Sequence, residues 1–185
     1  MNKFVGAAAA LMLAGVAVPA AAAVNDTSAS SSATAKIIRP ISVTAGPALA
    51  FGTIVRPSAG TSTVVVSSGG ARSITGGGDA VALASTSAAA AEFTVGGEGA
   101  QAITVHVPLT FDLVNQTGGG EHLTVSTTNS QFANNGTGDY VTTLGGSLGS
   151  DAPGLLVKVG GSFSVTPTTS TGDFQGTLTV SAKYN

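Results

Sequence analysis

The sequence predicts an all-β fold, a single antiparallel β-sandwich, and three observations support this prediction. Short runs rich in β-branched and aromatic residues recur along the chain, as they do in strands. Glycine and proline separate these runs at the spacing of a sandwich, and the chain contains 26 glycines and 7 prolines. The last fourteen residues, 172–185, alternate between apolar and polar side chains, which indicates a strand with one buried face.

The first 23 residues have the features of a secretory signal peptide. A lysine at position 3 precedes an apolar stretch over residues 4–18, and three alanines at 21–23 offer a cleavage site. The apolar stretch is too short for a stable membrane span, which needs about 20 residues. We therefore expect cleavage after Ala23, export to the periplasm or the cell surface, and a mature chain without a stable membrane span.

Residues 24–36 form a low-complexity segment of small residues, mainly serine and alanine. Such a segment cannot bury enough apolar area to order itself, so we expect an N-terminal extension followed by one domain over residues 37–185. One interpretation of the extension is a flexible leader, and the other is a donor strand that becomes ordered on a partner. The donor strand would use small, mostly apolar odd-numbered positions, which are Thr27, Ala29, Ala33, Ala35 and Ile37.

Turn residues bound the expected strands. Pro57 ends the run before it, because proline has no amide to pair in a ladder, and consecutive glycines end several others. Gly160 and Gly161 divide one long apolar stretch into two expected strands. An alanine-rich run over residues 84–91 lacks an apolar stripe and predicts at most a short helical turn. In chain order, the expected strands are residues 37–43, 49–55, 63–67, 71–75, 92–95, 103–109, 122–126, 155–159, 162–166 and 172–185.

The composition excludes several functional classes. Charged residues make up 9% of the chain and the cations are dispersed, unlike the clustered lysine and arginine of nucleic-acid-binding proteins. The chain has no cysteine, which excludes a disulfide framework and a cysteine nucleophile. Stability must therefore come from sheet hydrogen bonds, core packing or partner subunits.

The sequence contains no recognisable catalytic or cofactor-binding constellation. His106 and His122 each fall opposite the apolar face of their strands, and the carboxylates are isolated in sequence. No His, Cys and carboxylate spacing of a metal cluster occurs, although loops rich in glycine, asparagine and aspartate leave weak Ca²⁺ binding open. We therefore expect a protein that is not an enzyme and that carries no cofactor.

The C-terminal segment carries a motif of one glycine, alternating apolar residues and a penultimate tyrosine, which are Gly172, Phe174, Leu178, Val180, Ala182 and Tyr184. This motif resembles that of chaperone–usher fimbrial pilins, which have a glycine fourteen residues from the end, alternating apolar residues and a penultimate tyrosine. The resemblance implies an immunoglobulin-like sandwich without its last strand, in which a periplasmic chaperone pairs first with the terminal strand. The N-terminal extension of a neighbouring subunit then replaces the chaperone by β-augmentation. The cysteine pair of the best-known pilins is absent here.

A second resemblance covers nearly the whole of the expected mature chain. Residues 49–54, 70–73, 93–98 and 172–185 are similar to an exported bacterial family classed as domain of unknown function 4402. This family has no established activity, so the resemblance implies an exported immunoglobulin-like β-sandwich and leaves its role open.

Two functional hypotheses remain. The first is a structural subunit of a surface fimbria or related polymer, which would associate with itself or with related subunits and would act in cell adhesion. The second is a free periplasmic or surface-attached binding module for an unidentified ligand. An apolar groove beside the C-terminal segment would favour assembly, whereas pairing of that segment on both sides by strands of its own chain would favour a self-sufficient domain.

Overall fold

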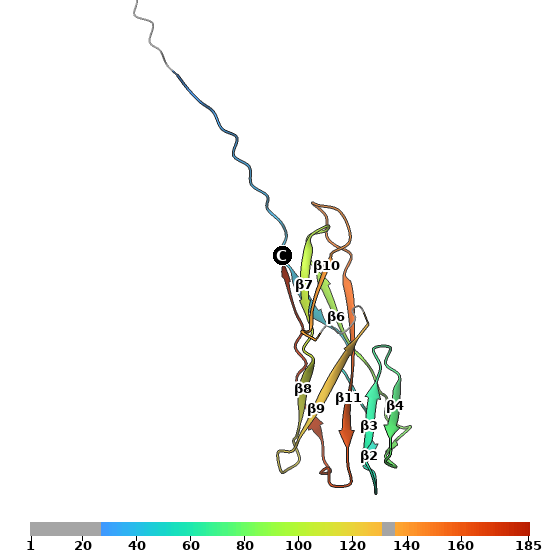
Figure 1. Cartoon of the computed structure of the whole chain (residues 1–185). Coiled ribbons are helices and arrows are strands. Elements are labelled where there is room, and N and C mark those ends of the chain that lie inside the picture. The colour runs from blue at the N-terminus through green and yellow to red at the C-terminus, as the bar shows by residue number, and fades with distance from the viewer. Residues whose placement is uncertain (1–26, 131–135) are drawn as a thin grey trace, which may run out of the picture. The chain divides into compact units, whose positions relative to one another are not determined.

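The computed structural model describes residues 27–130 and 136–185 (Figure 1). The predicted signal peptide, residues 1–23, lies outside the described residues. By its internal contacts the chain divides after Lys36, into Met1–Lys36 and Ile37–Asn185. Residues 27–36 are exposed and carry no helix or strand.

Residues from Ile37 onward form an all-β antiparallel sandwich, which confirms the predicted fold class. In the described part of the chain, one sheet has eight strands, and its main path runs β1–β6–β11–β9–β8–β12, with β3 pairing β11 and β4 pairing β3. Its strands are β1 (Ser42–Ala45), β3 (Ser62–Val66), β4 (Arg72–Gly76), β6 (Ala91–Gly96), β8 (Thr110–Asn115), β9 (His122–Asn129), β11 (Leu155–Val165) and β12 (Phe174–Gln175).

Two smaller sheets complete the described fold. The first has the order β10–β7–β13, where the strands are Asp139–Thr143, Ala102–His106 and Ser181–Tyr184. The second pairs β2 (Ile54–Val55) with β5 (Val81–Ala82). The strands β7 and β10 lie at one end of the domain, and β3 and β4 lie toward the other (Figure 1).

The longest strand, β11, corrects the expectation of two separate strands around a glycine pair. Its first half pairs with β6 and its second half with β3, while β9 pairs with the middle on the opposite side. A Cβ atom at Gly160 would collide with the backbone of Val66, so the neighbouring strand approaches too closely for any larger residue. The glycine at this position therefore serves close strand packing and does not form a turn.

The chain passes from one sheet to the other between β7 and β8. The strand β7 pairs with β10 and β13, whereas β8 pairs with β9 and β12. Pro108 lies between them and has no amide for a ladder, which fits a break in pairing at this corner. The C-terminal segment follows the same corner, so β12 lies on β8 and β13 lies on β7.

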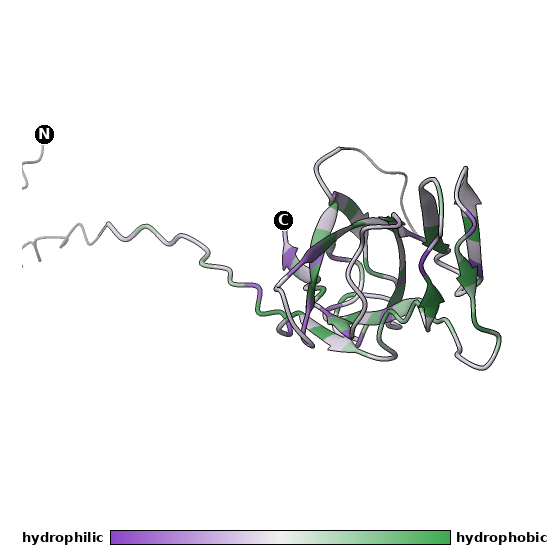
Figure 2. Cartoon of the chain, turned by 90° about the horizontal axis from the view of Figure 1, so that it is seen from below, coloured by the Kyte–Doolittle hydropathy of each residue, from purple (hydrophilic) through white to green (hydrophobic). Residues whose placement is uncertain are grey.

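Two hydrophobic clusters form the core, and the strands curl around them when the domain is viewed end-on (Figure 2). The larger cluster contains Ile103, Val105 and Val157, which are fully buried. The smaller cluster is built around Phe51 and Phe163, whose rings meet edge to face with their centroids 4.8 Å apart. Leu49 packs against both clusters.

Two further elements differ from the sequence prediction. The strand expected over residues 49–55 is reduced to β2 and an isolated bridge between Ala50 and Ala89. Residues 84–91 form turns, a bridge and the first residue of β6, without a helix. In the first segment Gly52 has a φ of +72° and interrupts the extended backbone, and in the second the small residues give little apolar area for continuous pairing.

Candidate functional site

An apolar groove of about 930 Å³ runs along one side of the C-terminal segment. Residues 45–54 border one side of the groove and residues 169–178 border the other. At about 3.3 Å per residue, a border of ten residues extends for roughly 30 Å. Because Gly52 and Gly172 have positive φ and bend the two borders, this length is an upper limit for the groove.

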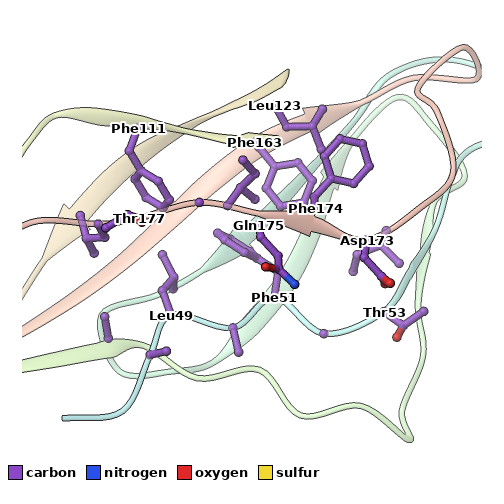
Figure 3. Close-up of a pocket in the computed structure, with 18 of the residues that line it drawn as sticks. Leu49, Phe51, Thr53, Phe111, Leu123, Phe163, Asp173, Phe174, Gln175 and Thr177 are labelled. Carbon is purple, nitrogen blue, oxygen red and sulfur yellow. The ribbon is translucent and has the colours of Figure 1, made fainter. Parts of the chain in front are cut away.

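The floor of the groove consists of large apolar side chains, some from strands and some from the segment before β2. Figure 3 shows Phe111 and Leu123, from β8 and β9, and Phe163, from β11, at one wall, with Leu49 and Phe51 facing them. Phe111 and Leu123 are only half-buried although both pack against the smaller cluster. Covering such partly exposed apolar surface would be favourable by about 25 cal/mol per Å².

Two backbone segments beside the groove are sparsely hydrogen-bonded. We call residues 49–53 the N-terminal rim and residues 176–180, of which 176–178 line the groove, the C-terminal rim. In the N-terminal rim, Ala50 pairs with Ala89 and Thr53 bonds with residues of the β5 region, whereas the amides of Leu49 and Phe51 have no hydrogen-bond partner among the described residues. In the C-terminal rim, no backbone amide or carbonyl bonds to another described residue. The Phe51 carbonyl accepts a 2.8 Å hydrogen bond from the Arg72 guanidinium, so the free groups of the N-terminal rim include the amides of Leu49 and Phe51 but not this carbonyl. The C-terminal rim offers both amides and carbonyls to an additional strand.

A mismatch in strand length explains the C-terminal rim. Gln175 pairs with Val114 on β8, and Ser181 pairs with His106 on β7. Between these two pairs, one chain segment has seven residues, 107–113, whereas the opposite segment has five, 176–180. A continuous antiparallel ladder needs equal numbers, so pairing stops after Gln175 and resumes at Ser181. Gly176 lies so close to the Asp112 carbonyl that a Cβ atom would collide with it. The predicted strand over residues 172–185 is therefore two short strands with the rim between them.

Polar contacts tie the two sides of the groove together beyond the rims. At one end, the Arg56 guanidinium donates a hydrogen bond of 3.0 Å to the Thr169 carbonyl. At the other end, the Tyr184 hydroxyl donates one of 3.0 Å to the Arg39 carbonyl. Of these four residues, Arg56 and Thr169 line the groove, whereas Tyr184 and Arg39 lie outside its lining.

Gly172, the first residue of the predicted C-terminal motif, turns the chain into β12. Its φ of +148° is one that L side chains rarely adopt, and a Cβ atom there would lie 2.6 Å from the Asn115 side-chain oxygen. Asn115 is buried and accepts hydrogen bonds from the amides of Thr117 and Gly118. Glycine at 172 therefore allows a buried asparagine to organise the turn beside the groove.

Tyr184 is the centre of a polar cluster that we call the terminal clamp, formed by Arg39, Glu98, Asp151 and Tyr184. The Tyr184 hydroxyl accepts a 2.7 Å hydrogen bond from the Glu98 amide as it donates to Arg39. The Arg39 guanidinium lies 3.2 Å from the buried Glu98 carboxylate and 3.0 Å from that of Asp151. The Gly149 amide, and then the Arg39 amide and charge, lower the pKa of Glu98 by stabilising its ionised form.

The comparison with protein families identifies the chain. A family model described as Domain of unknown function (DUF4402) matches residues 41–184. The chain belongs to this family. The predicted resemblance to the DUF4402 family is thus confirmed, and the match spans β1 to β13 and includes the whole groove. Neither curated proteins nor solved structures include a significant match to this DUF4402 chain.

The structure brings the C-terminal residues of the predicted assembly motif to the groove or to the core of the DUF4402 domain. Phe174 and Leu178 line the groove, and Val180 is buried in the larger cluster, against which Leu178, Ala182 and Tyr184 also pack. The predicted donor residues are exposed and lie outside the strands; they are Thr27, Ala29, Ala33, Ala35 and Ile37. Ile37 is 95% exposed.

The two histidines of the DUF4402 domain lie on partly or fully exposed strand positions. His106 Nδ1 lies 2.8 Å from Asp139, across the β7–β10 pair, and His122 Nδ1 lies 3.9 Å from Asp112. Over residues 27–130 and 136–185, no group of three or more His, Cys, Asp and Glu side chains could hold a metal ion. The same residues include no helix of the length and apolarity that a bilayer requires.

Sequence reasoning missed the groove floor and most of the terminal clamp. Phe111 and Phe163 occupy apolar strand positions, and alternation alone cannot distinguish a side chain that faces a filled core from one that faces a groove. Glu98 and Arg39 are 59 residues apart, so sequence spacing could not pair them. The one local signal was a carboxylate directly after consecutive glycines, Gly96 and Gly97, the second of which leaves room for the Tyr184 ring.

Proposed function

We propose that this DUF4402 protein is a non-enzymatic structural subunit of a fimbria-like surface polymer, and that its groove accepts residues 27–37 of a second copy. The observation that carries the proposal is an apolar groove between two rims with free backbone groups, beside the C-terminal segment. A strand that enters the groove would extend the sandwich by β-augmentation.

The properties of the rims favour a strand over a small ligand. An extended backbone can pair with amides and carbonyls along a whole rim, whereas a compact ligand reaches only a few of them. The groove also lacks a gathering of charged groups: Arg56 and Asp173 are the charged residues in its lining, and Arg56 already bonds to Thr169. Its chemistry therefore suits a neutral chain segment.

The N-terminal extension has the properties of such a segment. Residues 27–37 are long enough, at about 3.3 Å per residue, to span the groove. Residues 27–37 contain neither helix nor strand, so no existing hydrogen-bond ladder would have to break before they pair with the rims. Their small side chains mean that most of the affinity would come from backbone hydrogen bonds, with Ile37 as the one large apolar contact.

A cross-linking experiment between copies tests the proposal, and the absence of cysteine makes it simple. One variant carries Ala33→Cys in the extension, and a second carries Thr177→Cys beside the groove (Figure 3). After mixing, a short bismaleimide should link the two variants into dimers. The proposal predicts cross-linking well above that obtained with Ser73→Cys, an exposed position on β4 outside the groove lining.

Equal yields with Thr177→Cys and Ser73→Cys would contradict the proposal, because they would show collision without docking. In that case the alternative, a free binding module whose groove holds another ligand, would become the better account. Prior addition of a peptide with the sequence of residues 27–38 should compete with the specific link, and failure to compete would also count against assembly.

A further inference from the structure

The terminal clamp holds the chain at the point where the N-terminal extension joins the domain. Arg39 is fixed by three kinds of contact: its amide and guanidinium both donate to the Glu98 carboxylate, and its carbonyl accepts from Tyr184. The guanidinium also forms an ion pair with Asp151. Pro40 follows directly, which restricts Arg39 to extended backbone angles.

The connection is short enough for the extension to reach the groove of its own copy. After Arg39 the chain enters β1, which ends at Ala45, where the groove lining begins. If the chain reversed direction near residues 38–41, residues 27–37 would run antiparallel to β1 and past the N-terminal rim. With residues 38–41 in the reversal, residues 35–37 would lie beside β1, and residues 27–34, about 26 Å long at 3.3 Å per residue, would lie along residues 45–52 of the groove border.

Such self-docking would compete strongly with assembly. A segment tethered by a few residues has an effective concentration in the millimolar range, far above that of a second copy in dilute solution. A subunit in which nothing prevented the chain from reversing direction near residues 38–41 would therefore fill its own groove and remain a monomer.

We propose that Arg39, Glu98 and Tyr184 are positioning residues that prevent self-docking and so reserve the groove for a second copy. This inference rests on the proposed function. A reversal near Arg39 would require rotation of its backbone, and that rotation would break the hydrogen bonds from its amide and to its carbonyl. Glu98 would then be left as a buried carboxylate without its cation, which is a costly state.

The partition of cross-links within and between copies tests the inference. A single chain carries both Ala33→Cys and Thr177→Cys, and a short bismaleimide is added at one fixed protein concentration. Products within a chain keep the monomer mass, whereas products between chains form dimers and ladders on a denaturing gel. With the clamp intact, products between chains should dominate.

Two variants loosen the clamp in different ways. Glu98→Gln removes the charge that holds Arg39, and Tyr184→Phe keeps the ring but removes the hydroxyl. Each should raise the ratio of internal to external products about tenfold, the effect expected from the loss of one or two hydrogen bonds that involve charged or buried groups. Asp79→Asn is the matched control, because Asp79 is also a loop carboxylate held by hydrogen bonds, from Ser58 and Ala59, but it does not contact the clamp.

The outcomes separate the two proposals. An unchanged ratio in Tyr184→Phe, or an equal rise in Asp79→Asn, would overturn the role of the clamp while leaving assembly intact. If Glu98→Gln fails to fold, Tyr184→Phe decides the question alone. If neither product exceeds the yield of the Ala33→Cys and Ser73→Cys pair, docking of the extension is absent and the proposed function itself fails.

Discussion

The two hydrophobic clusters of this domain differ in how completely they are covered. The larger cluster is closed by β10 and β13, and its central residues, such as Ile103 and Val157, are fully buried. The smaller cluster contains buried Phe51 and Phe163, but neighbours such as Leu123 remain half-buried and line the groove. Both clusters use the same kinds of residue, so composition does not explain the difference.

The difference follows from pairing at the C-terminal segment. Where the segment pairs with β7 as β13, the core beneath it is closed. The groove lies along residues 169–178, where the segment turns, pairs briefly as β12 and then leaves the ladder. The larger cluster stabilises the isolated chain, whereas the exposed part of the smaller cluster would be buried only when a partner strand binds in the groove. The following predictions test this contrast, from the largest expected effect to the smallest.

A matched pair of substitutions compares the clusters directly. Ile103→Ala, in the closed cluster, should lower the free energy of unfolding by about 2–5 kcal/mol, because the side chain is fully buried and leaves a cavity. Leu123→Ala removes the same number of carbon atoms from the groove floor and should cost the dispersed chain less than half as much. Urea denaturation measures both values, and equal losses would contradict an open smaller cluster.

Substitutions at Tyr184 separate the packing of its ring from its role in the clamp. Tyr184→Ser removes the ring from the larger cluster and both hydrogen bonds of the hydroxyl, so it should cost about 2–4 kcal/mol. Tyr184→Phe keeps the packing and should cost about 1–2 kcal/mol. Thermal unfolding at fixed protein concentration would measure the stability lost in each variant. Similar losses in Tyr184→Ser and Tyr184→Phe would show that the hydroxyl and not the ring provides the stability.

Low pH should reduce the stability of the folded domain, because carboxylates in the terminal clamp and near the groove have lowered pKa values in the folded state. The Gly149 amide and Arg39 lower the pKa of Glu98 in the clamp, and the Ser170 hydroxyl and amide lower that of Glu121 near the groove. Each group stabilises the folded state fully above its ordinary pKa, about 4.3, and loses this contribution as the pH falls through the lower folded value.

Chemical denaturation between pH 7 and pH 2 would measure this loss. Glu98→Gln should flatten the acid limb of the profile, because one of the groups that bind protons on unfolding is gone. An acid limb with the same slope in the wild type and in Glu98→Gln would contradict the assignment of the clamp.

Enlarging a donor side chain should strengthen assembly without changing the subunit. Ala33→Val adds two carbon atoms on the odd-numbered face of the extension, and their burial in the groove should stabilise the assembly by about 1–1.5 kcal/mol. Ser32→Val is the control, because adjacent residues of a strand point to opposite faces. Sedimentation would show assembly of Ala33→Val at about tenfold lower concentration, and the same shift in Ser32→Val would contradict the proposed face.

The sequence revealed the fold class because alternation and turn residues report burial locally. The runs over residues 63–67 and 92–95 coincide closely with β3 and β6. It could not reveal the C-terminal rim, because residues 172–185 keep their period of two while the opposite chain has two more positions than the rim. Register between distant strands is a property of the pair, and one strand's alternation carries no information about it.

The candidate site, like the fold, was predicted only in part from the sequence. The C-terminal motif pointed to the correct segment, and Phe174 and Leu178 do line the groove. The floor residues and the clamp depend on contacts across the sheet and across 59 residues of sequence, as between Arg39 and Glu98. Such contacts follow from tertiary packing, which neither propensity nor periodicity encodes.

Amide hydrogen exchange of the two rims tests the central claim most directly. In the dispersed chain, the amides of Leu49, Phe51 and residues 176–180, which have no hydrogen-bond partner among the described residues, should exchange rapidly, whereas those of β7 should be protected. In the assembled form, isolated at high concentration, the rims should become protected by pairing with residues 27–37, while β7 remains unchanged. Rims that exchange equally fast in both forms would contradict the claim that the groove receives a strand from a second copy.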